Sequence, residues 1–365
     1  MQTLRIGILG TRGIPNRYGG FEQCAEYLAK GLVEKGHQVW VYCSSAHEYQ
    51  KPVWEGVQLI HCKDPEPRIG TAGQFLYDLH CFRDARKRKF DVLLQLGYTS
   101  SSIWRRYWPK TINIVNMDGL EWKRSKYSSK VQRFLKLAEK WAALHADALV
   151  ADSIGIKDYL ESAYRKPSTF IPYGAEIFAS PDERYLEMQQ VPPYGYDLLI
   201  ARMEPENNIE MILEGHLQAN SNYPLLVVGG TANKFGQYLK EKFGQQPLIR
   251  FTGGIYDAAL INNLRYFSRL YYHGHSVGGT NPSLLEAMGC RCLIAAHNNA
   301  FNRAVLGVDG FYFRSAHEVA ALSASVTTKE RQSEWLSANL QKIETIYNWP
   351  AVVAAYEQLM LGFII

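Results

Sequence analysis

Three turns in the sequence combine residues that could bind a negatively charged ligand. The first, "GTRGIPNRYGGFE", begins at Gly10 directly after the apolar stretch "LRIGIL". Glycines such as Gly19 and Gly20 let a backbone approach a ligand closely, and a helix starting there would offer free N–H groups to an anion. A dinucleotide-binding turn is the alternative. However, Gly10 and Gly13 give only G-x-x-G, and the next strand, "VYCSS", ends without the acid that holds a ribose.

The second turn, "ARMEPENNIE", places Arg202 at the end of a predicted strand and Asn207 at the start of a predicted helix. The rigid fork of an arginine donates two parallel hydrogen bonds to a phosphate group. We therefore consider Arg202 and Asn207 as phosphate ligands. The alternative is a surface arginine followed by an asparagine helix cap.

The third turn, "HGHSVGGTNPSLLEAMG", exposes the backbone amides of Gly278 and Gly279 ahead of a helix that Thr280 or Asn281 would cap. Glu286 lies one turn further along this helix. Its carboxylate could accept both hydroxyls of a ribose while the preceding amides hold a phosphate. A solvated helix residue is the alternative, but the neighbours of Glu286 are apolar, and an acid in such surroundings needs a partner.

These turns need strands and helices that bring them to one edge of a sheet. Apolar stretches alternate with helix-like stretches along nearly the whole chain, which is typical of parallel βαβ units. One apolar face of a first helix is formed by Phe21, Ala25, Leu28 and Leu32. The predicted strands of the first half are "RIGILG", "QVWVYCS", "VQLIHC", "DVLLQLG", "INIVNMDG" and "ALVADS".

The strand pattern restarts after a polar, proline-bearing stretch, with "YDLLIAR", "PLLVVGG", "LIRFTGG", "RLYYHGH" and "CLIAAH". We therefore predict an α/β protein with two Rossmann-like, doubly wound domains that face a central cleft. The domains are assigned to residues 1–175 and 176–340, and we predict a helical tail at 341–365 that crosses back to the first domain. Ligands of such sheets bind at the carboxyl ends of the strands, where the three turns lie.

Composition places the chain among globular proteins, with 47% hydrophobic and 21% charged residues among 365. Residues 1–175 hold 26 of the 40 Lys and Arg residues and 17 of the 35 acidic ones, a net charge of +9, so the remainder carries −4. No apolar run reaches the roughly 18–20 residues of a membrane span. We see no signal peptide at the N-terminus, and the six cysteines include no C-x-x-C pair, so a reduced, cytoplasmic protein is expected.

The stretches "ARMEPENNIEMI" and "GGTNPSLLEAMG" resemble the donor-binding half of GT-B retaining glycosyltransferases of family four (glycosyltransferase group 1). Together with "GTRGIPNRYGGFE" and "NMDGLEWKR", they are similar to the bacterial rhamnosyltransferase-type subgroup. The resemblance covers nearly the whole chain. It implies a GT-B fold and transfer of a sugar, best assigned as L-rhamnose from dTDP-rhamnose with retention, to a lipid-diphosphate-linked saccharide in surface polysaccharide synthesis. A UDP- or GDP-sugar is the alternative donor.

The resemblance also implies roles for individual residues. Asp118, in "NMDG", would orient a hydroxyl of the acceptor or donor, although an ordinary D-G turn is the alternative. The turn "FTGGI", with Gly253 and Ile255, would hold the base through backbone groups. Two positions depart from the wider family, which has a glutamate where Gly278 stands and a lysine where Asn207 stands. One acid fewer near the sugar fits a donor with fewer hydroxyls, such as a 6-deoxy sugar.

Catalysis in such an enzyme needs no side-chain nucleophile. We assign Asp118, Arg202 and Glu286 as catalytic residues, and positioning with charge stabilisation as their contribution. The sequence contains no Asp-x-Asp pair, so we predict no metal site and no cofactor besides the nucleotide-sugar substrate. His273 and His275 are interpreted as packing or turn residues.

Cations mixed with aromatic residues in "RDARKRK", "WRRYWPK" and "EWKRSKYSSK" favour an anionic membrane surface as a partner of the N-terminal domain. Solvated helix faces are the alternative. We thus expect a cytoplasmic protein, peripheral on the inner face of the cell membrane, that does not bind nucleic acid. Other functions to test are a GT-B sugar-nucleotide epimerase, a nicotinamide-dependent oxidoreductase and a non-catalytic sugar-binding module.

Overall fold

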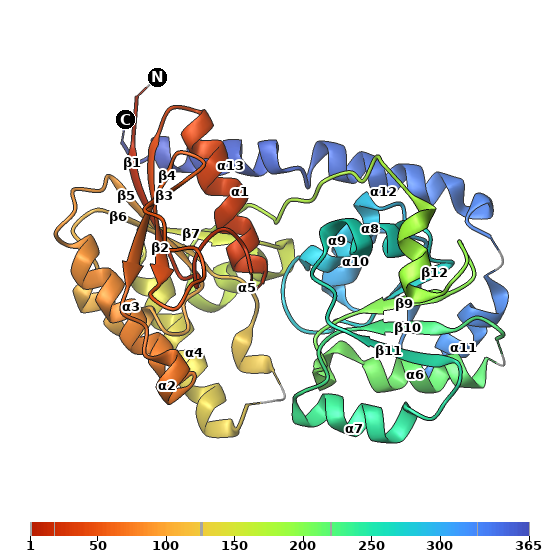
Figure 1. The fold of residues 1–365 in the computed structure, drawn as a ribbon. Coiled ribbons are helices and arrows are strands. Elements are labelled where there is room, and N and C mark those ends of the chain that lie inside the picture. The colour runs from red at the N-terminus through yellow and green to blue at the C-terminus, as the bar shows by residue number, and fades with distance from the viewer. Residues whose placement is uncertain (1, 18, 125–126, 220, 327, 365) are drawn as a thin grey trace. The chain divides into compact units, whose positions relative to one another are not determined.

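The computed structural model describes every residue except Met1, Tyr18, Ser125, Lys126, Asn220, Thr327 and Ile365. The chain forms two compact units (Figure 1). The first contains Met1–Lys123, Tyr127–Tyr173 and Trp349–Ile365, and the second contains Arg124–Lys126 and Gly174–Asn348. The sequence analysis placed the corresponding divisions at 175 and 340.

The first unit is built on an eight-stranded sheet with the order β3-β4-β2-β1-β5-β6-β7-β8. All its pairings are parallel except that of β3 with β4. Because the inner strands are covered on both faces, they are mostly apolar, and Ile6, Ile8 and Leu94 are fully buried. The strands are β1 (Arg5–Leu9), β2 (Gln38–Ser44), β3 (Val53–Trp54), β4 (Val57–Cys62), β5 (Val92–Leu96), β6 (Ile112–Asn116), β7 (Ala148–Ala151) and β8 (Thr169–Phe170).

The helices of the first unit include one from the far end of the chain. Of the predicted face of α1, Ala25, Leu28 and Leu32 are buried in the core and Phe21 is half-buried. The helices are α1 (Gly20–Glu34), α2 (Glu66–Ile69), α3 (Ala72–Ala85), α4 (Ser129–His145), α5 (Ile154–Tyr164) and α13 (Trp349–Leu361), with 3-10 turns η1 (Ser102–Tyr107) and η2 (Glu121–Lys123).

Helix α13 packs on α1. The rings of Trp349 and Tyr27 stack with centroids 4.4 Å apart, and Glu357 lies 3.0 Å from the Nε2 atom of His37. A Cβ atom on Gly31 would lie 2.7 Å from Val353, so glycine at this position allows the two helices to approach closely. The last helix of the chain is therefore part of the core of the first unit.

The second unit is built on a six-stranded, wholly parallel sheet with the order β11-β10-β9-β12-β13-β14. Its core includes Leu199, Leu270 and Phe313. The strands are β9 (Asp197–Ile200), β10 (Leu225–Val228), β11 (Ile249–Gly253), β12 (Leu270–His273), β13 (Ile294–His297) and β14 (Phe311–Phe313). The helices are α6 (Ile209–Gln218), α7 (Lys234–Phe243), α8 (Ala258–Tyr266), α9 (Pro282–Gly289), α10 (Ala300–Leu306), α11 (Ala316–Ser325) and α12 (Ser333–Thr345), with 3-10 turns η3 (Glu183–Gln189), η4 (Pro205–Asn207) and η5 (Glu330–Gln332).

Both sheets reverse their winding direction once. The reversal lies between β1 and β5 in the first sheet and between β9 and β12 in the second. Ligands of doubly wound folds bind at such switch points, outside the carboxyl ends of the strands. The predicted α/β architecture with two doubly wound sheets is confirmed, and the turns after β1, β9 and β12 lie at the switch points.

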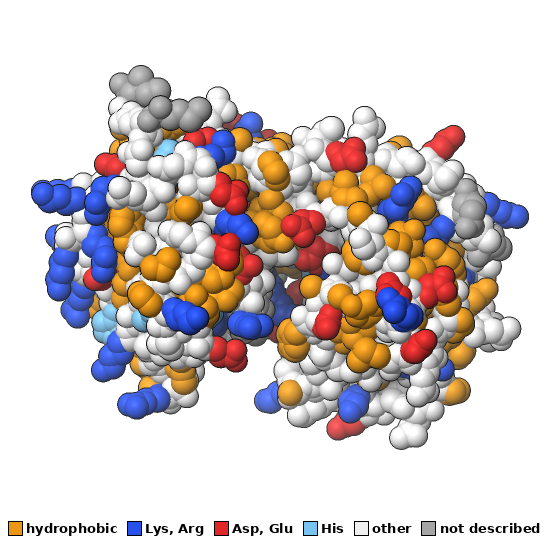
Figure 2. Space-filling view, turned by 45° about the horizontal axis from the view of Figure 1, so that its top comes forward, with side chains coloured by type: hydrophobic (Ala, Val, Ile, Leu, Met, Phe, Trp, Pro, Cys, Tyr) orange, Lys and Arg blue, Asp and Glu red, His pale blue; other side chains and the backbone are white. Residues whose placement is uncertain are grey.

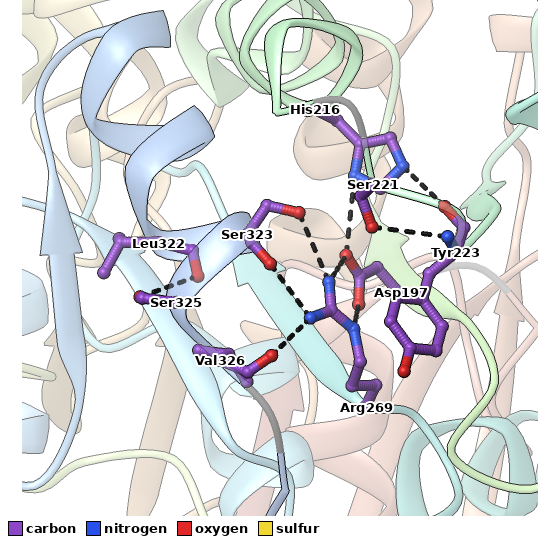
Figure 3. Close-up of polar contacts among 9 residues, drawn as sticks. All are labelled: Asp197, His216, Ser221, Tyr223, Arg269, Leu322, Ser323, Ser325 and Val326. Atoms are coloured by element: carbon purple, nitrogen blue, oxygen red, sulfur yellow. Dashed lines mark hydrogen bonds and ion pairs between the residues drawn. The ribbon is translucent and has the colours of Figure 1, made fainter.

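One buried ion pair fixes the opposite, amino end of the second sheet (Figure 3). Asp197 begins β9 and receives two hydrogen bonds from the guanidinium of Arg269, from Nε to Oδ1 at 2.8 Å and from Nη2 to Oδ2 at 2.6 Å. The guanidinium also donates to the carbonyl oxygens of Ser323 (3.0 Å) and Val326 (2.7 Å). This network ties β9 to the end of α11.

Candidate functional site

The turn after β9 presents Arg202 at the switch point of the second sheet. Arg202 is exposed, and no acidic side chain within the described residues pairs with its guanidinium. Its carbonyl oxygen accepts hydrogen bonds from the amide of Glu204 and from the Nδ2 atom of Asn207, both at 2.7 Å. The buried Asn207 side chain is thus bonded to the backbone of Arg202, and these bonds hold the turn that presents the guanidinium.

The turn after β12 is joined to this turn by hydrogen bonds. The backbone amide and the hydroxyl of Ser276 both donate to the carbonyl oxygen of Glu206, at 3.0 and 2.7 Å. Asn208 donates from Nδ2 to the carbonyl oxygen of Gly274 at 2.7 Å. A Cβ atom on Gly274 would lie 2.0 Å from the carbonyl oxygen of Asn207. The two turns therefore form one frame on either side of the switch point.

The glycines before α9 leave open space. Gly278 has a φ of +126°, which favours glycine, and no atom lies within 4 Å of where its Cβ would be. Asn281 caps α9, since its Oδ1 atom accepts a hydrogen bond from the amide of Ser283 at 2.9 Å. Thr280 is buried. Gly278 thus leaves open space just ahead of the positive end of a helix, where an anion is stabilised.

Glu286 has a partner that sequence reasoning missed. Its carboxylate is paired with the guanidinium of Arg265, a buried residue of α8 whose Nη1 atom also donates to Asn262. Burial disfavours the charged form of Arg265, but the charge of Glu286 more than offsets this and raises the pKa of the guanidinium. Because Arg265 lies on another helix, no local spacing in the sequence could have revealed the pair.

The turn after β11 lies at the same edge of the second sheet. Gly253 has a φ of +77°, and no atom lies within 4 Å of the position of its missing Cβ. Its carbonyl oxygen accepts a hydrogen bond from the amide of Gly229 at 2.9 Å, and Ile255 is half-buried. The second unit therefore brings Arg202, Gly253 and the Gly278 turn to one sheet edge.

In the first unit, the glycine turn after β1 largely satisfies its own polar groups. Gly10 has a φ of +99°, and a Cβ there would lie 2.2 Å from the carbonyl oxygen of Leu96. The amide of Arg12 donates to Glu22 at 2.9 Å, and the guanidinium of Arg12 binds Glu66 at 2.7 and 3.0 Å.

The part of this turn next to α1 is different. Gly19 is the N-cap of α1 with an extended backbone, and no side chain caps the helix there. The helix then begins at Gly20. Gly19 and Gly20 therefore stay candidates for anion binding, while Tyr18, which belongs to the same predicted motif, lies outside the described residues.

Asp118 follows β6 at the carboxyl edge of the first sheet. It has a φ of +43°, and its amide donates to the Oδ1 atom of Asn116 at 2.9 Å. Its carboxylate accepts a hydrogen bond from the hydroxyl of Tyr173 at 3.3 Å. Asn116 in turn donates from Nδ2 to the hydroxyl of Tyr356 on α13, at 2.9 Å. Asp118 is thus half-buried and positioned by residues from three separate segments of the chain.

A metal centre finds no support in the part of the chain that the structure describes, where no group of three or more His, Cys, Asp or Glu residues could hold an ion. All six cysteines are buried and unbridged. Burial, followed by the charges of Asp118 and Asp152, raises the pKa of the Cys24 thiol to about 12. This thiol is therefore protonated and unreactive at neutral pH.

Two comparisons of the sequence with known proteins gave partial matches. A family model described as "Domain of unknown function (DUF1972)" matches residues 3–176, somewhat less than half of the chain. The chain is 26% identical over 156 residues to O-antigen chain mannosyltransferase B of Escherichia coli. That match covers 41% of this chain and 40% of the relative, so it spans less than half of the relative's length.

Solved structures match over nearly the full chain. Sucrose-phosphate synthase from Thermosynechococcus elongatus has a TM-score of 0.81 at 16% identity, with 98% of both chains covered. The Anabaena protein HepE, in complex with UDP-glucose, has a TM-score of 0.77 at 15% identity, with 97% of this chain and 98% of that chain covered. The two doubly wound units therefore have the GT-B fold.

Proposed function

We propose that the chain is a glycosyltransferase whose second unit binds a nucleotide-sugar donor and whose first unit binds the acceptor. The observation that carries this proposal is the frame at the second switch point, which presents an exposed Arg202 without an acidic partner among the described residues and the open space at Gly278. A guanidinium and free amides at one sheet edge suit a diphosphate. The similarity to an O-antigen mannosyltransferase and the UDP-glucose bound by HepE support the same chemistry.

The donor has its other groups close by. Gly253 and Ile255 would hold the base, and Glu286, with its charge balanced by Arg265, would accept the ribose hydroxyls. Asn207 would act on the diphosphate by holding Arg202 rather than as a direct ligand. As the more specific assignment we propose L-rhamnose from dTDP-rhamnose, because Gly278 leaves the sugar side of the turn without an acid.

The proposed reaction is transfer with retention to a lipid-diphosphate-linked saccharide of surface polysaccharide synthesis. The acceptor hydroxyl attacks the sugar from the face that the diphosphate leaves, and a phosphate oxygen takes its proton. Arg202 and the amides of Gly278, Gly279 and Thr280 stabilise the leaving charge. The amides of Gly19 and Gly20 are a second candidate anion site, in the first unit. Asp118, oriented by Tyr173, positions the acceptor hydroxyl.

Nucleotide-sugar binding tests the proposal. We expect dTDP-rhamnose to raise the melting temperature more than UDP- or GDP-sugars, because only ligands of the folded state stabilise it. Glu286→Ala is expected to weaken donor binding by about 1–3 kcal/mol, the cost of a buried polar contact.

Transfer of labelled sugar to a lipid-linked acceptor then distinguishes a transferase from an epimerase, which converts the donor alone, and from a binding module, which converts nothing. If no nucleotide sugar binds, the proposal is wrong.

We further propose that the first unit docks on the anionic inner face of the cell membrane. Figure 2 shows Lys and Arg side chains gathered along the margin of this unit. Arg105 lies 4.4 Å above the ring of Trp141, and α4 exposes Leu137 and Leu144 among its cations. Not every residue of the predicted basic and aromatic segments lies on the surface, because Trp108 is buried. Ser125 and Lys126, from the same segments, lie outside the described residues. None of the described helices is long and apolar enough to cross a bilayer.

Vesicle sedimentation tests the membrane proposal. Each cation near an anionic surface contributes about 1 kcal/mol, so vesicles with phosphatidylserine should sediment the protein at low salt and release it at high salt. Leu137→Glu combined with Leu144→Glu should weaken this binding, and zwitterionic vesicles serve as the control. Equal recovery in the supernatant with and without anionic lipid at low salt would refute the proposal.

A further inference from the structure

Two histidine rings are stacked at the carboxyl end of β12. The ring centroids of His273 and His275 lie 4.4 Å apart with 17° between the ring planes. His273 is buried, with 1% of its surface exposed, whereas His275 is half-buried. His273 is the last residue of the strand, and His275 follows two residues later, ahead of the Gly278 turn. The pair is therefore part of the frame that faces the second switch point.

The ring nitrogens of this pair lack partners. Neither nitrogen of His273, nor Nδ1 of His275, has a hydrogen-bond partner among the described residues. Leaving a buried polar atom in this state is unfavourable, and most such atoms in folded proteins are paired. Unpaired imidazole nitrogens beside an exposed arginine therefore point to a ligand that supplies the missing partner.

The charges around the pair determine what this ligand is. Burial, then the charges of Arg202 and Arg124, lower the pKa of His275 to about 3, so its ring is neutral and carries one N–H donor. Burial, then the proximity of His275 and His297, lower the pKa of His273 as well. The carboxylate of Glu206, in the adjoining turn, lies 3.6 Å from the guanidinium of Arg124 and balances that charge. The positive charge of Arg202 near His275 therefore favours an anionic ligand.

The backbone on both sides fixes the position of the His275 ring. The carbonyl oxygen of His275 accepts hydrogen bonds from the Nδ2 atoms of Asn299 and Asn302, both at 3.0 Å. The next residue, Ser276, is bonded to Glu206. The backbone that carries the ring is thus bonded to two other segments of the chain, which limits how far the ring can move.

We propose that His275, supported by the stacked ring of His273, is a diphosphate ligand of the nucleotide-sugar site and acts beside Arg202. This inference rests on the proposed function. An imidazole N–H donates to a phosphate oxygen that bears no proton at neutral pH, and the Arg202 guanidinium contacts the same group. The sequence analysis interpreted both histidines as packing residues, and the unpaired nitrogens are the observation that changes this interpretation.

The test compares the nucleoside diphosphates dTDP, UDP and GDP with their nucleosides, by titration calorimetry on the whole chain. His275→Phe keeps a ring to stack on His273 but removes both nitrogens. We expect it to weaken the best-binding diphosphate about tenfold or more and to leave the matching nucleoside unchanged. His275→Gln, which retains an N–H donor, should recover part of the loss. His317→Phe, the same change at an exposed position of α11, is the matched control and should bind as the wild type does.

The outcomes separate this inference from the proposed function. If the wild type binds a nucleoside diphosphate and a folded His275→Phe protein binds it equally well, the inference is wrong and the proposed function stands. If His275→Phe weakens nucleoside and diphosphate alike, the residue has a structural role and the inference is again wrong. If the wild type binds none of the three diphosphates, the proposed function fails and the inference fails with it.

Discussion

Replacing Asp197 with asparagine is expected to destabilise the protein by about 3–5 kcal/mol, because the substitution leaves a buried guanidinium without its counter-charge. Asp197 is fully buried and Arg269 is 3% exposed. His216 lies beside this carboxylate, with its Nδ1 atom 3.4 Å from Asp197, while its Nε2 atom donates to the carbonyl oxygen of Tyr223 at 2.9 Å. Arg269 thus supplies the two charge-assisted hydrogen bonds that balance this buried anion (Figure 3).

Urea unfolding followed by circular dichroism measures this effect, and the loss should appear in the transition of the second unit. The matched control is Arg184→Ala, which removes an exposed ion pair with Asp182 in the same unit and should leave the midpoint nearly unchanged. A midpoint of Asp197→Asn equal to that of the control would show that the buried network contributes no stability.

Replacing Arg202 with alanine is expected to lower kcat for sugar transfer by about 10²–10³-fold, because the guanidinium stabilises charge that develops on the leaving diphosphate. Lysine at this position should recover only part of the rate, since a point charge cannot donate the two parallel hydrogen bonds of the fork. Initial rates with saturating donor and acceptor measure both effects.

Arg250→Ala is the matched control for this prediction. Arg250 is an exposed arginine on β11 of the same unit, and its contact is with the carbonyl oxygen of Gln190. We expect wild-type rates from this variant. A folded Arg202→Ala protein with wild-type kcat would remove Arg202 from the catalytic machinery and would require another group to hold the diphosphate.

The architecture could be predicted from the sequence because parallel strands covered on both faces are mostly apolar. The short hairpin of β3 and β4 escaped prediction. It turns at Glu55 and Gly56, both with positive φ, and the pair Glu-Gly is a weaker turn signal than Asn-Gly. The strand β3 itself has only two residues, which is too short for an alternating pattern to be visible.

The sequence predicted those residues of the candidate site that local sequence patterns identify. The positions of Arg202 and Gly278 follow from the ends of predicted strands. The pairing of Glu286 with Arg265 joins two helices, and no pattern in a single sequence encodes it. In the glycine turn, the amide of Arg12 is paired with Glu22, an acid in the first turn of α1 that the structure buries. The presence of this acid close to the turn was the available signal that the amides of the turn have an internal partner.

The helical tail shows the same limit. The sequence analysis assigned a helical tail to residues 341–365, but the structure ends α12 at Thr345 and begins α13 at Trp349. The two helices belong to different units. Helical propensity alone does not distinguish one long helix from two whose apolar faces pack on separate cores.

The membership of α13 in the first unit has a consequence for how the protein is made. A ribosome releases Gly20–Glu34 long before Trp349–Leu361, so α1 waits for its partner helix while the whole second unit is synthesised. During that interval the surface around Tyr27 and Gly31 is exposed and prone to wrong associations. A fragment that ends at Tyr173 would keep this surface uncovered permanently, so the first unit should be expressed alone only with the last helix joined back to it.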